Sequence, residues 1–223
     1  MPTTTALPAA QRGRAVPVLL GVVALFLAVE LPAYLGLDPA TSRVPLRSDY
    51  ALHYPLLVAH ILFGSVAVVT ACLQVWPWLR RTHPAVHRWS GRVYLFGGVF
   101  PGGLAVLGVA PVSSTGPVSA VGNTVLAVLW LLTAVAGYRA ARGRRYGDHR
   151  RWMLRSVALT FSIVLNRVWL VAYLLLLTPV LGDDQPALVV AAAGASVWTS
   201  WVVNLLVVEW WVLRPRHRAV PAV

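Results

Sequence analysis

The sequence predicts an all-α integral membrane protein, a bundle of six transmembrane helices with both termini in the cytoplasm. Composition is the first reason, because apolar residues make up 58% of the 223 residues and charged residues only 12%. Soluble globular chains carry roughly 25% charged residues. Length of the apolar runs is the second reason, since a helix needs about 20 mostly apolar residues to cross a bilayer. The third is the spacing of the arginines between those runs.

Six segments satisfy the length requirement, and prolines, glycines and aspartates mark the gaps between them. In chain order, the predicted spans are residues 16–37, 52–76, 93–112, 118–138, 152–178 and 187–213. Residues 1–15 are small, polar and proline-containing, which favours a disordered cytoplasmic lead. Residues 214–223 form the expected cytoplasmic tail. The first span has a basic flank, but it is too long for a signal peptide and no cleavage motif follows it, so it is expected to remain uncleaved.

All nineteen basic side chains are arginine, and sixteen of them fall in alternating gaps. The four clusters lie at residues 12–14, 80–92, 139–155 and 214–218. Cytoplasmic loops of membrane proteins carry the excess of basic residues, so these clusters predict that both termini lie on the cytoplasmic side of the cell membrane. The expected partners are the lipid bilayer and its anionic headgroups, which the cytoplasmic arginines would contact. Nucleic acid is not expected as a partner, because the basic residues sit in short loops against the membrane.

Ionisable side chains at membrane depth are costly and are candidates for a functional site. Glu30, His60 and Arg167 meet this description, and the neutral Asn166 stands beside Arg167. Helical rise places the first three in the outer half of the bilayer. We therefore expect an ion pair between Glu30 and Arg167, with His60 adjacent. The pair has two interpretations at this point: a contact that fixes helix packing, or a substrate or proton site in which His60 titrates.

A second set of candidates lies on the cytoplasmic side, where His87 and His149 come from two different connections. These two residues are candidates for cofactor binding. A structural zinc site needs four ligands, which the surrounding sequence does not offer, so no metal site of that kind is expected. A pair of imidazoles is enough for one haem. Two haems would need a second pair, but His53 and His60 lie on one face of one helix and cannot hold both sides of a haem.

The residues that carry a resemblance are clustered in the middle of the chain. They are His60, the stretch His87-Arg88 with Gly91-Arg92 and Tyr94, the run from His149 to Met153 with Arg155-Ser156, and Arg167. In these marks the chain resembles a bacterial family of predicted multi-pass membrane proteins, domain of unknown function 2306. The resemblance covers roughly residues 50–175. The flanking helices match the family only in their hydropathy. It implies a helical membrane bundle and no particular reaction.

Several functions therefore remain open for a multi-pass membrane protein with a buried Glu/His/Arg site and a cytoplasmic His/Arg cluster. One is a membrane enzyme that uses Glu30 or His60 as general acid or base on a lipophilic substrate. Another is a redox protein that binds haem or a metal through His87 and His149. A third is a small proton-coupled transporter. Whether the chain is an enzyme is undecided, although no phosphate-binding glycine-rich loop is present to favour nucleotide use.

Overall fold

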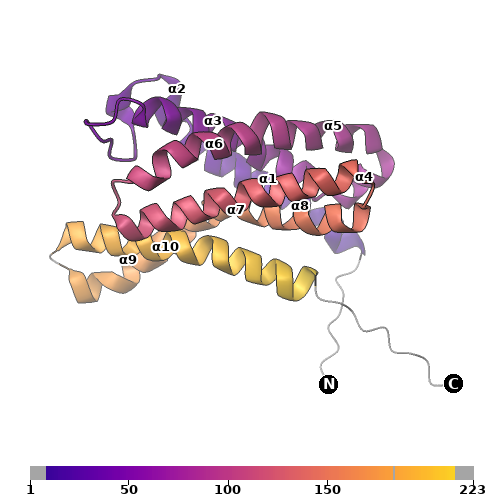
Figure 1. Ribbon diagram of the computed structural model, residues 1–223. Coiled ribbons are helices and arrows are strands. Elements are labelled where there is room, and N and C mark those ends of the chain that lie inside the picture. The colour runs from indigo at the N-terminus through magenta and orange to yellow at the C-terminus, as the bar shows by residue number, and fades with distance from the viewer. Residues whose placement is uncertain (1–8, 183, 214–223) are drawn as a thin grey trace, which may run out of the picture.

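The structure is a computed structural model that describes residues 9–182 and 184–213, and within these ranges it contains helices and no strand. Its helices run along one common axis and form a single elongated bundle (Figure 1). The predicted all-α class is therefore confirmed. The proposed disordered lead falls partly outside the described residues, and the tail at 214–223 lies wholly outside them.

From the N-terminus the helices are α1 (Ala9–Glu30), α2 (Pro32–Leu35), α3 (His53–Gln74), α4 (Pro77–Thr82), α5 (Pro84–Tyr94), α6 (Phe100–Val109), α7 (Pro117–Arg142), α8 (Tyr146–Thr160), α9 (Ser162–Leu181) and α10 (Gln185–Val207). Two short 3-10 turns, η1 (Pro39–Thr41) and η3 (Ala110–Val112), lie in the connections. Two π-helical turns, η2 (Leu95–Val99) and η4 (Val208–Val212), follow α5 and α10.

Five helical stretches are long and apolar enough to cross a membrane. They are His53–Gln74, Pro84–Val112, Pro117–Arg142, Ser162–Leu181 and Gln185–Trp210. In α1, the stretch Val16–Glu30 is apolar but shorter. The described part of the chain thus supports a membrane protein with several spanning helices.

Three boundaries differ from the sequence-based prediction. Helix α1 already begins at Ala9, within the expected disordered lead, because Ala9-Ala10-Gln11-Arg12 are good helix formers that extend the apolar helix. The same helix ends at Glu30, before the predicted end at residue 37, and Pro32 opens the short α2. The third helical stretch begins at Pro84 rather than at residue 93, since proline suits the first turn of a helix.

The predicted fifth span, residues 152–178, is not one helix but two. Phe161 separates α8 from α9 with φ −75° and ψ −6°, which departs from α-helical geometry. Side chains serve the last carbonyls of α8, because Asn204 donates to the Ala158 carbonyl at 3.0 Å and Ser162 donates to that of Leu159. These donors stabilise the break, which hydropathy alone does not reveal.

The core lies where α3 meets the helical stretch that follows α5. On α3, Ala67 and Ala71 are fully buried. A methyl group built on Gly98 would lie 2.9 Å from the Ala67 Cα atom, so the two backbones approach as closely as glycine permits. Pro101 has no N–H to donate to the Gly97 carbonyl, and the π-helical turn η2 immediately precedes it.

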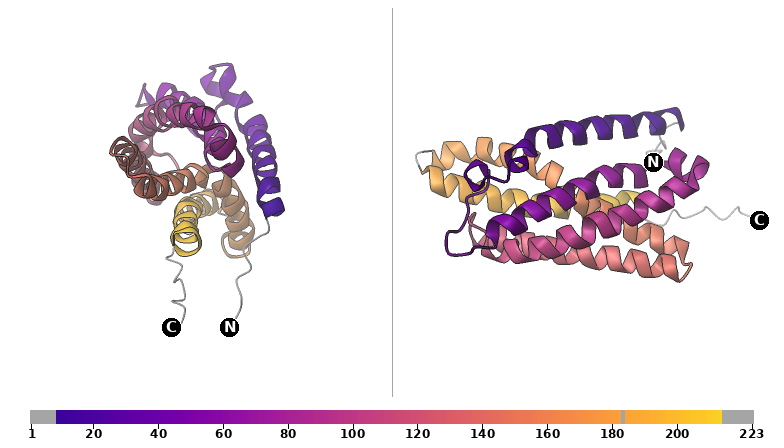
Figure 2. Two further views of the ribbon diagram at one scale, coloured as in Figure 1. Left: turned by 90° about the vertical axis from the view of Figure 1, so that its right-hand side faces the viewer. Right: turned by 90° about the horizontal axis from the view of Figure 1, so that it is seen from above.

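The two ends of the bundle carry different elements. One end holds α4, the connection between α7 and α8, and the start of α1, whereas the other holds η1 and the turn between α9 and α10 (Figure 1). Seen along the bundle, α1 lies at its edge (Figure 2). Among the described side chains of α9, only Ser162 and Asn166 are buried, so most of this helix faces outward.

Candidate functional site

The expected ion pair between Glu30 and Arg167 is present. Arg167 Nε donates to Glu30 Oε1 at 2.9 Å, and Arg167 Nη2 lies 3.5 Å from Glu30 Oε2. A third residue joins them, because Arg43 Nη1 lies 3.9 Å from the same Oε2 atom. Glu30 is mostly buried, with 17% of its side chain exposed. We call Arg43, Glu30 and Arg167 the outer cluster; it joins α1, α9 and the connection before α3.

Neighbouring groups hold the two arginines in place. Arg43 Nη2 donates to the Val29 carbonyl at 2.7 Å, in the last turn of α1. Asn166 Nδ2 donates to Ser196 Oγ at 3.2 Å, which ties the base of Arg167 to α10. The candidate Asn166 is thus buried as a positioning group. The sequence analysis did not single out Arg43, because nothing in the loop sequence shows that it turns back onto α1.

His60 makes its contacts on other helices than the ion pair. Its Nδ1 lies 3.0 Å from the Gly102 carbonyl on α6, and its ring meets Trp130 of α7 edge-on with centroids 6.5 Å apart. A carbonyl only accepts, so Nδ1 carries the proton and Nε2 holds the lone pair when the ring is neutral. The contacts of His60 are thus with α6 and α7, whereas the ion pair joins α1 and α9.

Buried hydroxyl groups connect α5, α7 and α8 in the middle of the bundle. The Tyr94 hydroxyl lies 2.7 Å from Ser156 Oγ and 2.8 Å from Thr160 Oγ1. Thr160 also accepts from the indole Nε1–H of Trp130 at 2.9 Å and donates to the Ser156 carbonyl. Because Thr160 has one hydroxyl proton, Tyr94 donates to Thr160 and Ser156 donates to Tyr94. This network was not predicted from the sequence.

His87 and His149 lie in the first turns of α5 and α8. His149 Nδ1 donates to the Gly137 carbonyl at 2.9 Å, which leaves Nε2 as the lone-pair nitrogen of the neutral ring. His87 Nδ1 is buried and has no hydrogen-bond partner. The two imidazoles are near enough to interact electrostatically, and Arg80 and Arg88 also act on His87. The two candidate cofactor ligands thus lie within electrostatic range of each other, on α5 and α8.

The environment of this pair limits which metal it suits. Among the described residues, no group of three or more histidine, cysteine, aspartate or glutamate side chains is placed to hold a metal ion. Zinc sites require at least three protein ligands. Haem iron, in contrast, takes four nitrogens from the porphyrin and needs only one or two axial ligands from the protein. An oriented imidazole with a free Nε2, beside a second imidazole with a buried unpartnered nitrogen, fits that requirement.

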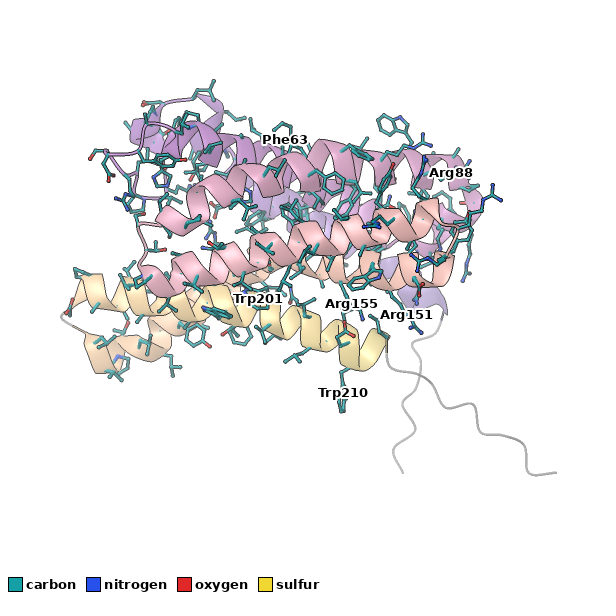
Figure 3. The ribbon with its side chains drawn as sticks, in the orientation of Figure 1. Phe63, Arg88, Arg151, Arg155, Trp201 and Trp210 are labelled. Atoms are coloured by element: carbon teal, nitrogen blue, oxygen red, sulfur yellow. The ribbon has the colours of Figure 1, made fainter. Side chains whose placement is uncertain are left out.

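Other arginines gather at the same end of the bundle. Figure 3 shows Arg88 and Arg151 there, with Arg155 further along the bundle. Arg155 Nη2 donates to Glu209 Oε2 at 3.0 Å, and its guanidinium lies 4.7 Å from the ring centre of Trp152. This contact links α8 to the turn that follows α10.

A family model described as a predicted membrane protein, DUF2306, matches residues 57–212. The chain belongs to the DUF2306 family. The match covers more than half of the chain and continues through α9 and α10, further than the resemblance in the sequence suggested. No curated protein and no solved structure matches this chain. DUF2306 membership confirms a membrane protein and assigns no activity, so the chemistry has to be argued from the side chains.

Proposed function

We propose that this chain is a six-span protein of the cell membrane that binds one haem at its cytoplasmic end, between His87 and His149, and transfers electrons. The observation that carries the proposal is the arrangement of these two imidazoles. One has its ring fixed by the Gly137 carbonyl, and the other has a buried nitrogen without a partner. Membership of a membrane-protein family supports the location.

The helix register supports the proposal that the two rings share one space. His87 precedes Tyr94 by seven residues, and His149 precedes Ser156 by seven. Seven residues are close to two helical turns, so each histidine lies on the same face as the hydroxyl residue that follows it. Both helices start at the same end of the bundle and run the same way (Figure 1). The Tyr94–Ser156 contact therefore supports a common side of the bundle for both histidines, about 10 Å nearer the starts of their helices.

Hydrogen bonding prepares His149 to act as a ligand. Histidines that bind metals donate their second ring nitrogen to a carbonyl or carboxylate, which fixes the ring and its tautomer. The Gly137 carbonyl supplies this partner for His149. A side chain at Gly137 would crowd the site, because a Cβ there would lie 2.7 Å from Met153 Sδ. Glycine at this position thus lets α7 approach α8 beside the imidazole.

Positive charge around the pair suits the rest of a haem. Haem carries two anionic propionates, and Arg80 and Arg88 interact electrostatically with His87. Guanidinium groups bind carboxylates through paired, charge-assisted hydrogen bonds. The bound haem would supply a one-electron redox centre; the chain's own residues fix the imidazoles and neutralise the propionates.

The proposed topology has six spans, with α1 as the first and both termini in the cytoplasm. Support comes from the arginine clusters, which alternate along the chain as the positive-inside rule requires. The same arginines are proposed to contact anionic headgroups of the inner leaflet. Trp210 is 63% exposed and projects away from the bundle (Figure 3), as expected of an indole at a membrane interface.

Absorption spectroscopy tests the haem proposal. Detergent-purified protein, expressed with adequate haem supply, is expected to show a Soret band that His87→Ala and His149→Ala each weaken or remove. His83→Ala is the matched control, because His83 is an exposed histidine on the same side that contacts Thr82. A wild-type protein that folds normally, takes up no added haemin and stays colourless would refute the proposal.

Cysteine labelling tests the topology, since Cys72 is the chain's only cysteine and is buried. In a Cys72→Ala background, Ser48→Cys and Ser114→Cys are expected to react with a membrane-impermeant maleimide in intact cells. Arg144→Cys should react only after lysis. Labelling of Arg144→Cys from outside would contradict the proposed orientation.

A further inference from the structure

The outer cluster contains two guanidinium groups and only one carboxylate. Arg167 and Arg43 approach the same oxygen of Glu30, at 3.5 Å and 3.9 Å. One negative charge cannot neutralise both, so the cluster keeps a net charge of about +1 at the lipid-facing edge of the bundle. An unbalanced charge in such surroundings is unfavourable unless an anion accompanies it.

The position of Glu30 explains why its carboxylate pairs with the two arginines. Glu30 is the last residue of α1, where the helix dipole is negative and a carboxylate is disfavoured. Arg43 offsets the same end of the dipole by donating to the Val29 carbonyl at 2.7 Å. The three side chains therefore hold one another in a fixed arrangement before any ligand arrives.

Both arginines retain N–H groups that point outward. Arg43 is 47% exposed and Arg167 is 40% exposed, whereas Glu30 is largely covered. A guanidinium has five N–H groups, and the contacts described above for each arginine use only part of them. Two guanidiniums that flank one point match the oxygens of a phosphate, which arginine binds through paired hydrogen bonds.

The surface next to Arg167 is apolar and exposed. On α9, Val168, Val171 and Leu175 are 61%, 56% and 73% exposed. Such a helix face within a membrane protein is covered by acyl chains. A ligand that fits both features has a phosphate at one end and hydrocarbon chains at the other.

We propose that Arg43 and Arg167 bind the phosphate of an anionic phospholipid of the outer leaflet, whose acyl chains lie along α9. Glu30 sets the spacing of the two guanidiniums and limits their affinity. Asn166, held by Ser196, positions Arg167 from the bundle side. This lipid site is independent of the haem proposal, because it lies at the opposite end of the bundle from His87 and His149.

Lipid retention measures this site directly. Protein purified in mild detergent is exchanged against equimolar phosphatidylglycerol and phosphatidylcholine, and the bound lipid is identified by native mass spectrometry. Wild type is expected to prefer phosphatidylglycerol by about tenfold, because both lipids offer a phosphate but phosphatidylcholine also carries a cationic choline that the two guanidiniums repel. Arg43→Gln should lose most of the preference. Arg47→Gln is the matched control, since Arg47 lies in the same connection but pairs with Asp49.

Glu30→Gln separates lipid binding from a purely structural role. Removing the carboxylate leaves two unopposed guanidiniums, so retention of phosphatidylglycerol should rise above wild type. A cluster that only braces α1 against α9 would instead lose stability without any gain in lipid retention, and that result would overturn the proposal. Equal retention of both lipids by wild type would overturn it as well. Competition of inorganic phosphate at low millimolar concentration, with no lipid preference, would assign the site to free phosphate and refute the lipid.

Discussion

The Tyr94 hydroxyl lies 2.7 Å from Ser156 Oγ, so a hydroxyl contact joins the end of α5 to α8. Both residues are fully buried, so the contact is shielded from water. Two helical turns earlier in each helix, the same helix faces carry His87 and His149. The two histidines that we propose as haem ligands thus stand at matching positions relative to this contact.

Thr160→Val is expected to destabilise the protein by about 1–3 kcal/mol, because the Trp130 indole N–H would remain buried without an acceptor. Valine keeps the shape of threonine, so the loss reports the hydroxyl. Thr124→Val is the control, since Thr124 only donates to the Ala120 carbonyl within its own helix. Thermal unfolding in detergent measures both. Equal melting temperatures for the two variants would contradict the role of the buried network.

Gly98→Ala is expected to cost about 1–3 kcal/mol, the usual cost of overpacking a tight core. A methyl group at Gly98 would lie 2.9 Å from the Ala67 backbone, which cannot move aside as a flexible side chain would. At Gly97 the nearest atom would be 3.5 Å away, so Gly97→Ala should be tolerated. Unfolding measurements on this adjacent pair test the close approach of the third helical stretch to α3. Similar stability of both variants would show that the approach is looser than described.

The Arg155–Glu209 pair is expected to contribute little, about 0.2–1 kcal/mol, because Glu209 is 46% exposed and its charge is screened. A double-mutant cycle with Arg155→Gln and Glu209→Gln isolates the coupling between the two side chains. The coupling should shrink as ionic strength rises. A coupling of several kcal/mol that is insensitive to salt would mean that the pair is buried against lipid or a partner.

Arg47 hydrogen-bonds Asp49 and lowers the pKa of that carboxyl below its ordinary value of 3.8. A depressed folded-state pKa gives stability that is present above 3.8 and is lost as the pH falls through the lower folded value. Both side chains are exposed, Arg47 to 44% and Asp49 to 65%, so the effect should be seen by NMR titration of the Asp49 carboxyl rather than by unfolding. Arg47→Gln should move the midpoint up toward 3.8. Identical midpoints in the two proteins would contradict the contact.

Much of the architecture could be predicted from the sequence, because the length of the apolar runs and the spacing of the arginines can both be read directly along the chain. The ion pair between Glu30 and Arg167 was also predictable, since an arginine in an apolar helix requires a partner. The break at Phe161 was not, because it depends on Asn204, which is 43 residues further along and donates to the Ala158 carbonyl. Hydropathy reports whether a segment suits lipid but does not report where its helix bends.

The candidate site was predicted in its residue types and only partly in its arrangement. His60 was expected beside Glu30 and Arg167, yet its contacts are with Gly102 and Trp130. Helix periodicity gives the face of one helix, whereas the partner depends on how neighbouring helices are ordered around it. Arg43 was missed for a related reason, because a loop has no periodicity from which its direction can be inferred.

The most direct test of the central claim is the haem content of the purified protein, measured by the pyridine haemochrome assay against protein concentration. We predict one haem per wild-type chain with a low-spin, six-coordinate spectrum. The double variant His87→Ala, His149→Ala should fold with native helical content and contain no haem. A haem-saturated preparation in which this double variant binds as much haem as wild type would contradict the assignment of His87 and His149.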